Sequence, residues 1–159
     1  MVRPVAGTAT VRVEGLDELR REIRKLDDGK SLTDELKAAN KRVGDIVVRR
    51  AQQRASALGR MQGAAGATLR SASQAARAVV TLGRAGVPFA MGAEFGAGRD
   101  QERVTRRGSV LGWNQFRPWR GSGPGAGYFL WPAVRDSNED IEQIYGDEIE
   151  RISSKAFPS

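Results

Sequence analysis

The strongest constraint on the fold is a pair of apolar stripes at helical spacing in the first third of the chain. Leucine and isoleucine recur three and four positions apart over residues 16–26, as they do along one face of an α-helix. A longer stripe runs from Leu32 to Val47, and most of the lysines and arginines between these positions fall on other sides of the helical wheel. Residues 16–57 are therefore predicted to be a helical segment with one break, after which Ser31 is the N-cap of the longer helix.

The rest of the chain predicts a small sheet and a C-terminal helix. Residues 9–14 alternate β-forming and charged side chains, which is typical of a strand. Residues 66–95 predict two further strands and a short element beginning near Pro88, for which helix and strand both remain open. The Gly- and Ala-rich residues 59–66 have no periodicity and predict a mobile loop. Residues 131–156 carry one apolar face at helical spacing and predict a single C-terminal helix.

Between the sheet and that helix lies a long irregular stretch, residues 96–127. It is rich in glycine, and a stretch of about 30 residues without regular structure usually has a function or is disordered. Short β-forming runs on either side of residues 106–108 predict a protruding hairpin within it. The run Gly121–Gly127 lacks the Lys-Ser/Thr of a phosphate-binding loop and is predicted to be a flexible linker.

These patterns together predict one α+β domain over residues 1–159. Its small, mostly antiparallel sheet is flanked by the long N-terminal helical segment and the C-terminal helix, and it carries the extended loop or hairpin of residues 96–127. A chain of 159 residues buries roughly 68–70% of its unfolded surface and needs no covalent staples.

The composition excludes several kinds of chemistry. The chain contains no histidine and no cysteine, so disulfides, zinc fingers, thiol nucleophiles, Ser-His-Asp triads and histidine-ligated metals are all excluded. Paired carboxylates occur only at positions that predict helix caps or solvent-facing sites. The sequence therefore predicts a protein that is not an enzyme and has no catalytic residues, metal or cofactor. It also lacks a signal sequence and a membrane-spanning run, so we expect synthesis in the cytoplasm and no membrane partner.

Charge is distributed unevenly along the chain. The total is 26 Lys+Arg against 19 Asp+Glu, a net charge of +7. Residues 1–130 hold 23 basic and 12 acidic side chains, a net of +11, whereas residues 131–159 hold 3 and 7, a net of −4. Such a chain can attract another copy of itself head to tail, or an acidic polymer through its middle, or simply present a solvated surface.

Aromatic and arginine side chains gather in and beside the irregular stretch. Six of the ten aromatic residues fall within 19 positions: Trp113, Phe116, Trp119, Tyr128, Phe129 and Trp131. Six arginines precede or interleave with them: Arg99, Arg103, Arg106, Arg107, Arg117 and Arg120. Three interpretations remain open: a protein–protein interface, which favours Trp, Tyr and Arg; core residues, for Phe129 and Trp131; and a surface for single-stranded nucleic acid.

Four segments, taken in order, resemble the tail-completion family of long-tailed bacteriophages, which are small minor proteins of the head–tail junction. They are Val11-Arg-Val-Glu-Gly-Leu-Asp-Glu-Leu19, Gly66-Ala-Thr-Leu-Arg-Ser71, Phe89-Ala-Met-Gly-Ala-Glu-Phe-Gly96 and Tyr128-Phe-Leu-Trp-Pro-Ala-Val134. Phe89, Ala97 and Tyr128 depart from the residues usual in the family. The four segments span nearly the whole chain.

The resemblance implies an α+β protomer that assembles as a ring, with six subunits expected, in the neck of the virion. The ring would complete the tail or connector between portal-side connector proteins and the tail terminator or tail tube. DNA would pass through it without being read. The mechanism is structural, and a ring needs two different patches on each copy.

The same resemblance assigns expected roles to the residues named above. Phe89, Glu94 and Phe95, together with the six clustered aromatic residues, are expected at contacts between subunits or with partners, although plain core is the alternative for Phe95. The six arginines are expected to contact carboxylates of a neighbour or phosphates of DNA in the channel. The alternative function is a basic nucleic-acid-binding protein that uses the Arg/aromatic loop of residues 99–131.

Overall fold

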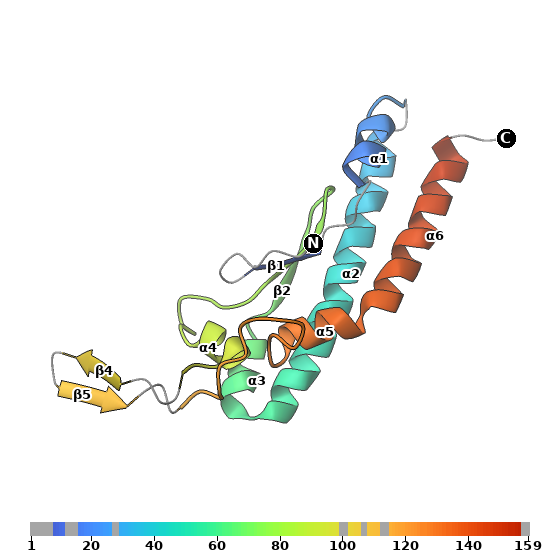
Figure 1. Ribbon diagram of the computed structural model, residues 1–159. Coiled ribbons are helices and arrows are strands. Elements are labelled where there is room, and N and C mark those ends of the chain that lie inside the picture. Colours follow the sequence, from blue (N-terminus) through green and yellow to red (C-terminus); the bar gives the residue numbers. More distant parts are fainter. Residues whose placement is uncertain are drawn as a thin grey trace.

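The computed structural model shows an α+β fold and describes residues 8–11, 16–26, 29–98, 102–105, 108–111 and 115–156 (Figure 1). Its strands are β1 (Thr8–Val11), β2 (Arg70–Ser73), β3 (Ala78–Thr81), β4 (Glu102–Thr105) and β5 (Gly108–Leu111). Its helices are α1 (Leu16–Ile23), α2 (Gly29–Leu58), α3 (Arg60–Gly66), α4 (Ala90–Phe95), α5 (Leu130–Asp136) and α6 (Asn138–Ala156). The predicted fold class is confirmed.

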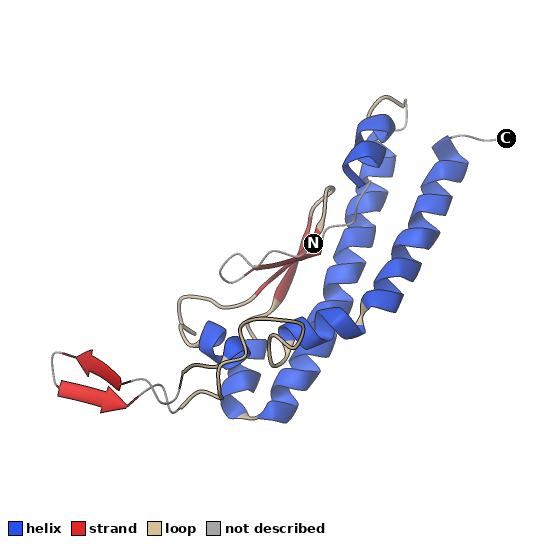
Figure 2. Cartoon of the chain, viewed as in Figure 1, coloured by secondary structure: helices blue, strands red, loops and turns tan. Residues whose placement is uncertain are grey.

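The main sheet has three strands in the order β1-β3-β2, and both pairings are antiparallel. The central strand β3 buries Ala78, Val79 and Val80, and the sheet lies against α2 (Figure 2). A Cβ atom at Gly44 of α2 would lie 2.7 Å from the Cβ atom of Ser71, so β2 approaches the helix this closely because position 44 is glycine. The two strands predicted within residues 66–95 are thus confirmed.

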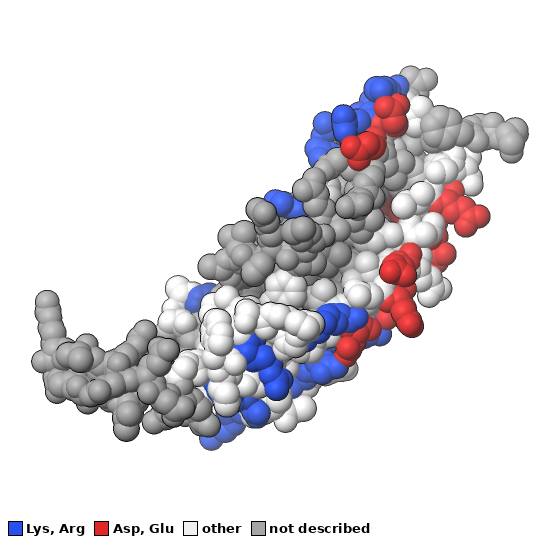
Figure 3. Space-filling model, in the orientation of Figure 1, with Lys and Arg blue, Asp and Glu red and all other residues white. Residues whose placement is uncertain are grey.

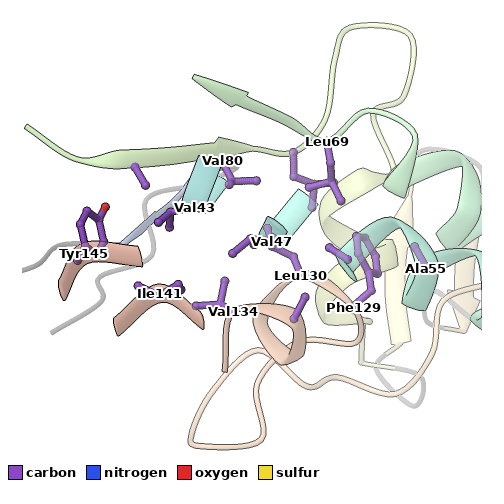
Figure 4. Packing of buried hydrophobic residues seen from close by; sticks show 14 of the residues in the cluster. Val43, Val47, Ala55, Leu69, Val80, Phe129, Leu130, Val134, Ile141 and Tyr145 are labelled. Atoms are coloured by element: carbon purple, nitrogen blue, oxygen red, sulfur yellow. The ribbon is translucent and has the colours of Figure 1, made fainter. Parts of the chain in front are cut away.

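The 30-residue helix α2 is the spine of the molecule, and α6 runs beside it (Figure 1). Figure 4 shows Val43 and Val47 of α2 facing Val80 of the sheet on one side. On the other side they face Leu130 and Val134 of α5. The core therefore lies between α2, the sheet and the two C-terminal helices, as the apolar stripes of the sequence predict.

Residues 60–66 form helix α3, so the prediction of a mobile loop there was wrong. The small side chains that gave the segment its loop-like composition allow α3 to pack closely on α2. A Cβ atom at Gly66 would lie 2.6 Å from the Cβ atom of Ala55, and Ala65 is fully buried. Gly59 makes the turn between the helices at a φ of +133°, a conformation that favours glycine.

Helix α2 begins at Gly29, two residues before the predicted N-cap, so Ser31 lies within the first turn. The N–H of Gly29 donates to the carbonyl oxygen of Leu26, and the hydroxyl of Thr33 donates to the carbonyl oxygen of Gly29. A Cβ atom at Gly29 would lie 2.5 Å from the carbonyl oxygen of Ile23, which makes glycine necessary in this tight turn between α1 and α2.

The predicted single C-terminal helix is two helices, because the chain breaks at Ser137 between α5 and α6. Two arginines of α2 hold the break. Arg50 donates to the carbonyl oxygen of Asp136 and to the hydroxyl of Ser137 and forms an ion pair with Asp140, while Arg54 pairs with the carboxylate of Asp136. The bond from Arg50 gives a partner to the backbone carbonyl oxygen of Asp136, one of the carbonyl groups that the end of a helix leaves without an intrahelical hydrogen bond.

A polar seam joins α2 to α6. The phenol of Tyr145 donates to the side-chain oxygen of Asn40 at 2.6 Å, and the Asn40 amide donates to the carbonyl oxygen of Gln74. Burial raises the pKa of Tyr145 to about 12. Glu148 of α6 is buried and accepts a hydrogen bond from Arg42 at 2.9 Å. A buried carboxylate needs such a partner.

Candidate functional site

The irregular stretch contains the predicted hairpin. Strands β4 and β5 pair antiparallel, with Glu102 opposite Leu111 and Thr105 opposite Gly108. The hairpin stands away from the helices and the main sheet (Figure 1). Arg103 lies within β4, whereas four other residues predicted at the site lie outside the described residues: Arg99, Arg106, Arg107 and Trp113.

The two ends of this excursion are held together at its base, beside α4. The N–H of Ala97 donates to the carbonyl oxygen of Arg117 at 2.9 Å, and the N–H of Arg120 donates to the carbonyl oxygen of Phe95 at 2.6 Å. Gly96 has a φ of +73°, and a Cβ atom there would lie 2.2 Å from the carbonyl oxygen of Pro118. The close approach of the two backbones therefore requires glycine at position 96.

The segment predicted to be a flexible linker, residues 121–127, is held at its end. The N–H of Gly127 donates to the carbonyl oxygen of Arg120 at 2.8 Å, and the side chain of Arg135 donates to the carbonyl oxygen of Ala126 at 2.9 Å. The N–H of Tyr128 donates to the carbonyl oxygen of Glu94. The loop thus returns the chain to α4 at a fixed point.

Glu94 is the central residue of this region. Its side chain is fully buried, and its carboxylate caps the start of α5. One oxygen, Oε2, accepts hydrogen bonds from the N–H groups of Phe129 at 3.0 Å and Leu130 at 2.9 Å. The other, Oε1, accepts from the N–H of Trp131 at 3.0 Å. These are N–H groups that have no partner within their own helix.

Neighbouring residues limit the space around the Glu94 carboxylate and change its pKa. Gly127 has a φ of +80°, and a Cβ atom there would lie 2.2 Å from Oε1 of Glu94. Burial raises the pKa of Glu94, and the backbone hydrogen bonds from residues 128–131 oppose that rise. The hydrogen bonds of the carboxylate with described residues all come from backbone N–H groups at the start of α5, so Glu94 fixes the position of that helix start.

The Glu94 carboxylate and the backbone N–H groups of residues 129–131 that it holds are called the Glu94 clamp below. An exposed tryptophan, Trp119, lies next to it. Trp119 is 61% exposed, and its ring lies 6.3 Å from the ring of Phe95 at an interplanar angle of 46°. A Cβ atom at Gly121 would lie 2.0 Å from the indole ring, so the tryptophan folds back over glycine. Contacts on two sides restrict the orientations open to the indole, and such restriction reduces the entropic cost of binding a partner.

Two arginines flank this tryptophan in the sequence, Arg117 and Arg120. The guanidinium of Arg120 lies 4.5 Å from the ring centre of Tyr128, and that of Arg117 lies 5.6 Å from it, which is cation–π geometry. The phenol of Tyr128 donates to the carbonyl oxygen of Pro118 at 2.7 Å. Arg117, Trp119, Arg120 and Tyr128 are called the Trp119 strip below.

A surface hollow of about 440 Å³ lies on another side of α4. Its lining is Pro88, Phe89, Gly92, Ala97, Gln115 and Phe116. A Cβ atom at Gly92 would lie 2.4 Å from the ring of Phe116, so this ring packs directly on α4. Phe89 and Phe116 are half-buried here.

The structure thus brings most of the described site residues together around α4 and the start of α5, but it distributes them between core and surface. Phe129 is fully buried in the core and Trp131 is half-buried, as in the core interpretation of these two residues. The sequence reasoning did not find the role of Gly127. No local pattern signals it, since the partner of Gly127 lies 33 positions earlier at Glu94.

Among the described residues, no group of three acidic side chains lies close enough to hold a metal ion, and no helix is long and apolar enough to cross a membrane. Comparison with protein-family models, with curated proteins and with solved structures finds no match for the chain.

Proposed function

We propose that the chain is a structural virion protein of the neck of a long-tailed bacteriophage. Copies of it form a ring, of six subunits, that completes the tail or connector at the head–tail junction and lets DNA pass. Its other partners are portal-side connector proteins and the tail terminator or tail tube. The proposal starts from the four segments that resemble the tail-completion family.

The observation that carries the proposal is the contact between two of those segments. Phe89–Gly96 includes α4, and Tyr128–Val134 includes the start of α5. The carboxylate of Glu94 in the first segment accepts three backbone hydrogen bonds from the second. Two resembling segments that meet in space have a common structural purpose, which supports the resemblance more strongly than their order in the chain does.

The shape of the molecule also favours an assembly role. The clamp around Glu94 closes the base of the excursion that carries the β4–β5 hairpin, and the hairpin stands away from the helices (Figure 2). A projecting arm on a fixed base suits contact with a neighbouring molecule. The two buried acids, Glu94 and Glu148, hold helix α5 and the α2–α6 seam together, which is structural work.

A conditional stop codon in the gene, within the phage that carries it, tests this function. Without the protein we expect DNA-filled heads and separate tails that fail to join, and infectivity should return when the protein is supplied in trans. Antibodies to the chain should label the neck of complete particles. Normal yields of infectious particles without the protein would contradict the proposal.

A second candidate function, a basic nucleic-acid-binding protein, is favoured by one observation. Trp119 is exposed between Arg117 and Arg120, an arrangement on which a base can stack while phosphates meet the guanidinium groups. Binding through phosphates weakens steeply with salt, so retention on nonspecific DNA at low and moderate salt measures it. Tight, salt-sensitive binding by a monomer would favour this candidate over the connector proposal.

A further inference from the structure

Among the side chains that the structure describes, two large hydrophobic residues are exposed, and their surroundings carry opposite charge. Trp119 is 61% exposed and Ile149 is 37% exposed. Trp119 lies between two exposed arginines, Arg117 and Arg120. Ile149 lies on α6, the most acidic helix of the chain.

The outer side of α6 is an acidic surface. It carries four exposed carboxylates, called the α6 acidic face below: Glu139, Glu142, Asp147 and Glu150. None of the four forms an ion pair with another described residue, whereas Asp140 and Glu148 of the same helix are paired. At about 100° per residue, Glu142 and Glu150 lie within roughly 100° of Ile149 around the helix. Ile149 therefore borders the acidic face.

The Trp119 strip is complementary to the α6 acidic face, because it combines an exposed apolar side chain with positive charge. Its tryptophan is supported by Phe95 and by Gly121. Arg117 and Arg120 form no ion pair with any described side chain; Arg117 donates instead to the carbonyl oxygen of Leu58. Their positive charge is thus available to an acidic partner. Fully desolvated Trp and Arg side chains dominate the energetics of protein interfaces.

The two surfaces lie on different parts of the molecule. In Figure 3 acidic side chains line the long edge formed by α6. Basic side chains gather over the end where α3 and the loop before α5 lie, as well as on α1. A contact between them must therefore join two copies, and it is heterologous, which closes into a ring when the rotation per copy allows it.

We propose that the Trp119 strip of one copy docks on the α6 acidic face of the next copy. Trp119 packs against Ile149 there, and Arg117 and Arg120 meet Glu142 and Glu150. This rests on the proposed function in one respect, since it names the contact by which the copies of the ring join. Nucleic acid would occupy the strip but would leave the acidic, apolar face of α6 without a partner.

Charge reversal on each surface, measured by sedimentation of the purified protein, tests the contact. Arg117→Glu with Arg120→Glu, and separately Glu142→Lys with Glu150→Lys, should each weaken self-association at least about 30-fold. A one-to-one mixture of the two variants should regain larger assemblies, because the unchanged strip docks on the unchanged face and the reversed, acidic strip docks on the reversed, basic face. Combining all four changes in one chain should restore larger assemblies.

Matched controls change the same charges elsewhere. Arg70→Glu with Arg77→Glu alters exposed residues in β2 and just before β3, and Glu18→Lys with Glu22→Lys alters exposed residues of α1. Both should leave self-association unchanged. If the controls weaken it as much as the test variants do, net charge drives association and the proposal is wrong. Circular dichroism of each variant confirms that it is folded.

Cross-linking covers the case in which association is weak, and the cysteine-free sequence makes it specific. Ser122→Cys lies in the loop after Trp119, and Gly146→Cys lies on the outer side of α6, where an added Cβ atom meets nothing within 4 Å. At about 1 mM protein, where a contact with a Kd near 1 mM is populated, oxidation of the mixture should join these two variants. Arg77→Cys is the control partner and should not react preferentially.

Three results would overturn the proposal. The protein could remain a monomer at about 1 mM and form no cross-link, or its self-association could be unchanged by charge reversal. The third is that Arg117→Glu with Arg120→Glu weakens retention on DNA but leaves self-association unchanged. None of these results depends on the phage experiment. Failure of the contact and failure of the neck function are therefore distinguishable, because a protein absent from virions can still associate through these surfaces, and a neck protein can join its copies elsewhere.

Discussion

Replacing Glu94 should destabilise the fold by an amount that depends on how many of its hydrogen bonds survive. In Glu94→Gln, the amide oxygen can take the place of Oε2 and keep the bonds from Phe129 and Leu130. The amide N–H₂ then faces the N–H of Trp131, so one bond is lost and two donors oppose each other. A buried donor without a partner costs about 1–3 kcal/mol, which is the expected loss for this variant.

Glu94→Ala removes all three acceptor bonds and should cost more. The hydrogen bonds from the N–H groups of Phe129 and Leu130 are buried, while that from Trp131 is partly buried. The expected loss is about 3–6 kcal/mol, a large part of the roughly 5–15 kcal/mol that stabilises a typical domain. For a chain of this length the melting temperature should fall by roughly 6–24 °C in Glu94→Ala and by about 2–12 °C in Glu94→Gln.

Urea denaturation monitored by circular dichroism measures both losses as shifts of the midpoint at constant slope. The matched control is Glu18→Ala, which removes an exposed carboxylate on α1 and should change the free energy of unfolding by less than about 0.5 kcal/mol. If Glu94→Ala were as stable as this control, the clamp would contribute nothing and the reasoning about Glu94 would be refuted. A larger loss in Glu94→Gln than in Glu94→Ala would also refute it, since it would reverse the expected order.

Three further predictions concern the same core. Burial raises the pKa of Glu94 above its ordinary value of 4.5, so near that pH the folded protein binds more protons than the unfolded chain. Wild type should therefore gain stability relative to Glu94→Gln as the pH falls toward 4.5, and the gain should level off below it. Paired urea titrations at several pH values measure this difference, and an opposite slope contradicts the raised pKa. Gly127→Ala should cost at least about 2 kcal/mol, since it combines a positive φ with a 2.2 Å approach to Glu94, whereas Gly146→Ala on open α6 should be neutral or stabilising in the same thermal melts. Tyr145→Phe leaves the buried oxygen of Asn40 without its donor and should cost about 1–3 kcal/mol by urea denaturation; equal stability would show that water replaces the phenol.

The sequence predicted those features that depend on neighbours along the chain. Helical spacing over residues 16–57 predicted α1 and α2, because burying one face of a helix requires apolar residues three and four apart. The β-forming runs around residues 106–108 predicted the hairpin β4–β5 for a similar reason. The separation of charge was also present in the sequence, though not its position on the surface.

What the sequence missed depends on close approach between distant residues. The segment of α3 has a composition typical of a loop, and it is helical because glycine and alanine let it pack on Ala55 of α2. The break at Ser137 depends on Arg50, which lies 87 positions earlier. Neither contact leaves a periodic signal in the chain.

The candidate site shows the same division. The sequence alone determined that aromatic and arginine residues gather before the C-terminal helices, and that Phe89–Gly96 and Tyr128–Val134 resemble segments of one family. Only the tertiary structure decided that Phe129 is core while Trp119 is exposed, and that Glu94 caps α5. The physical reason is that a carboxylate is stable in a protein interior only where donors converge on it, and here the donors come from backbone 35 to 37 positions away.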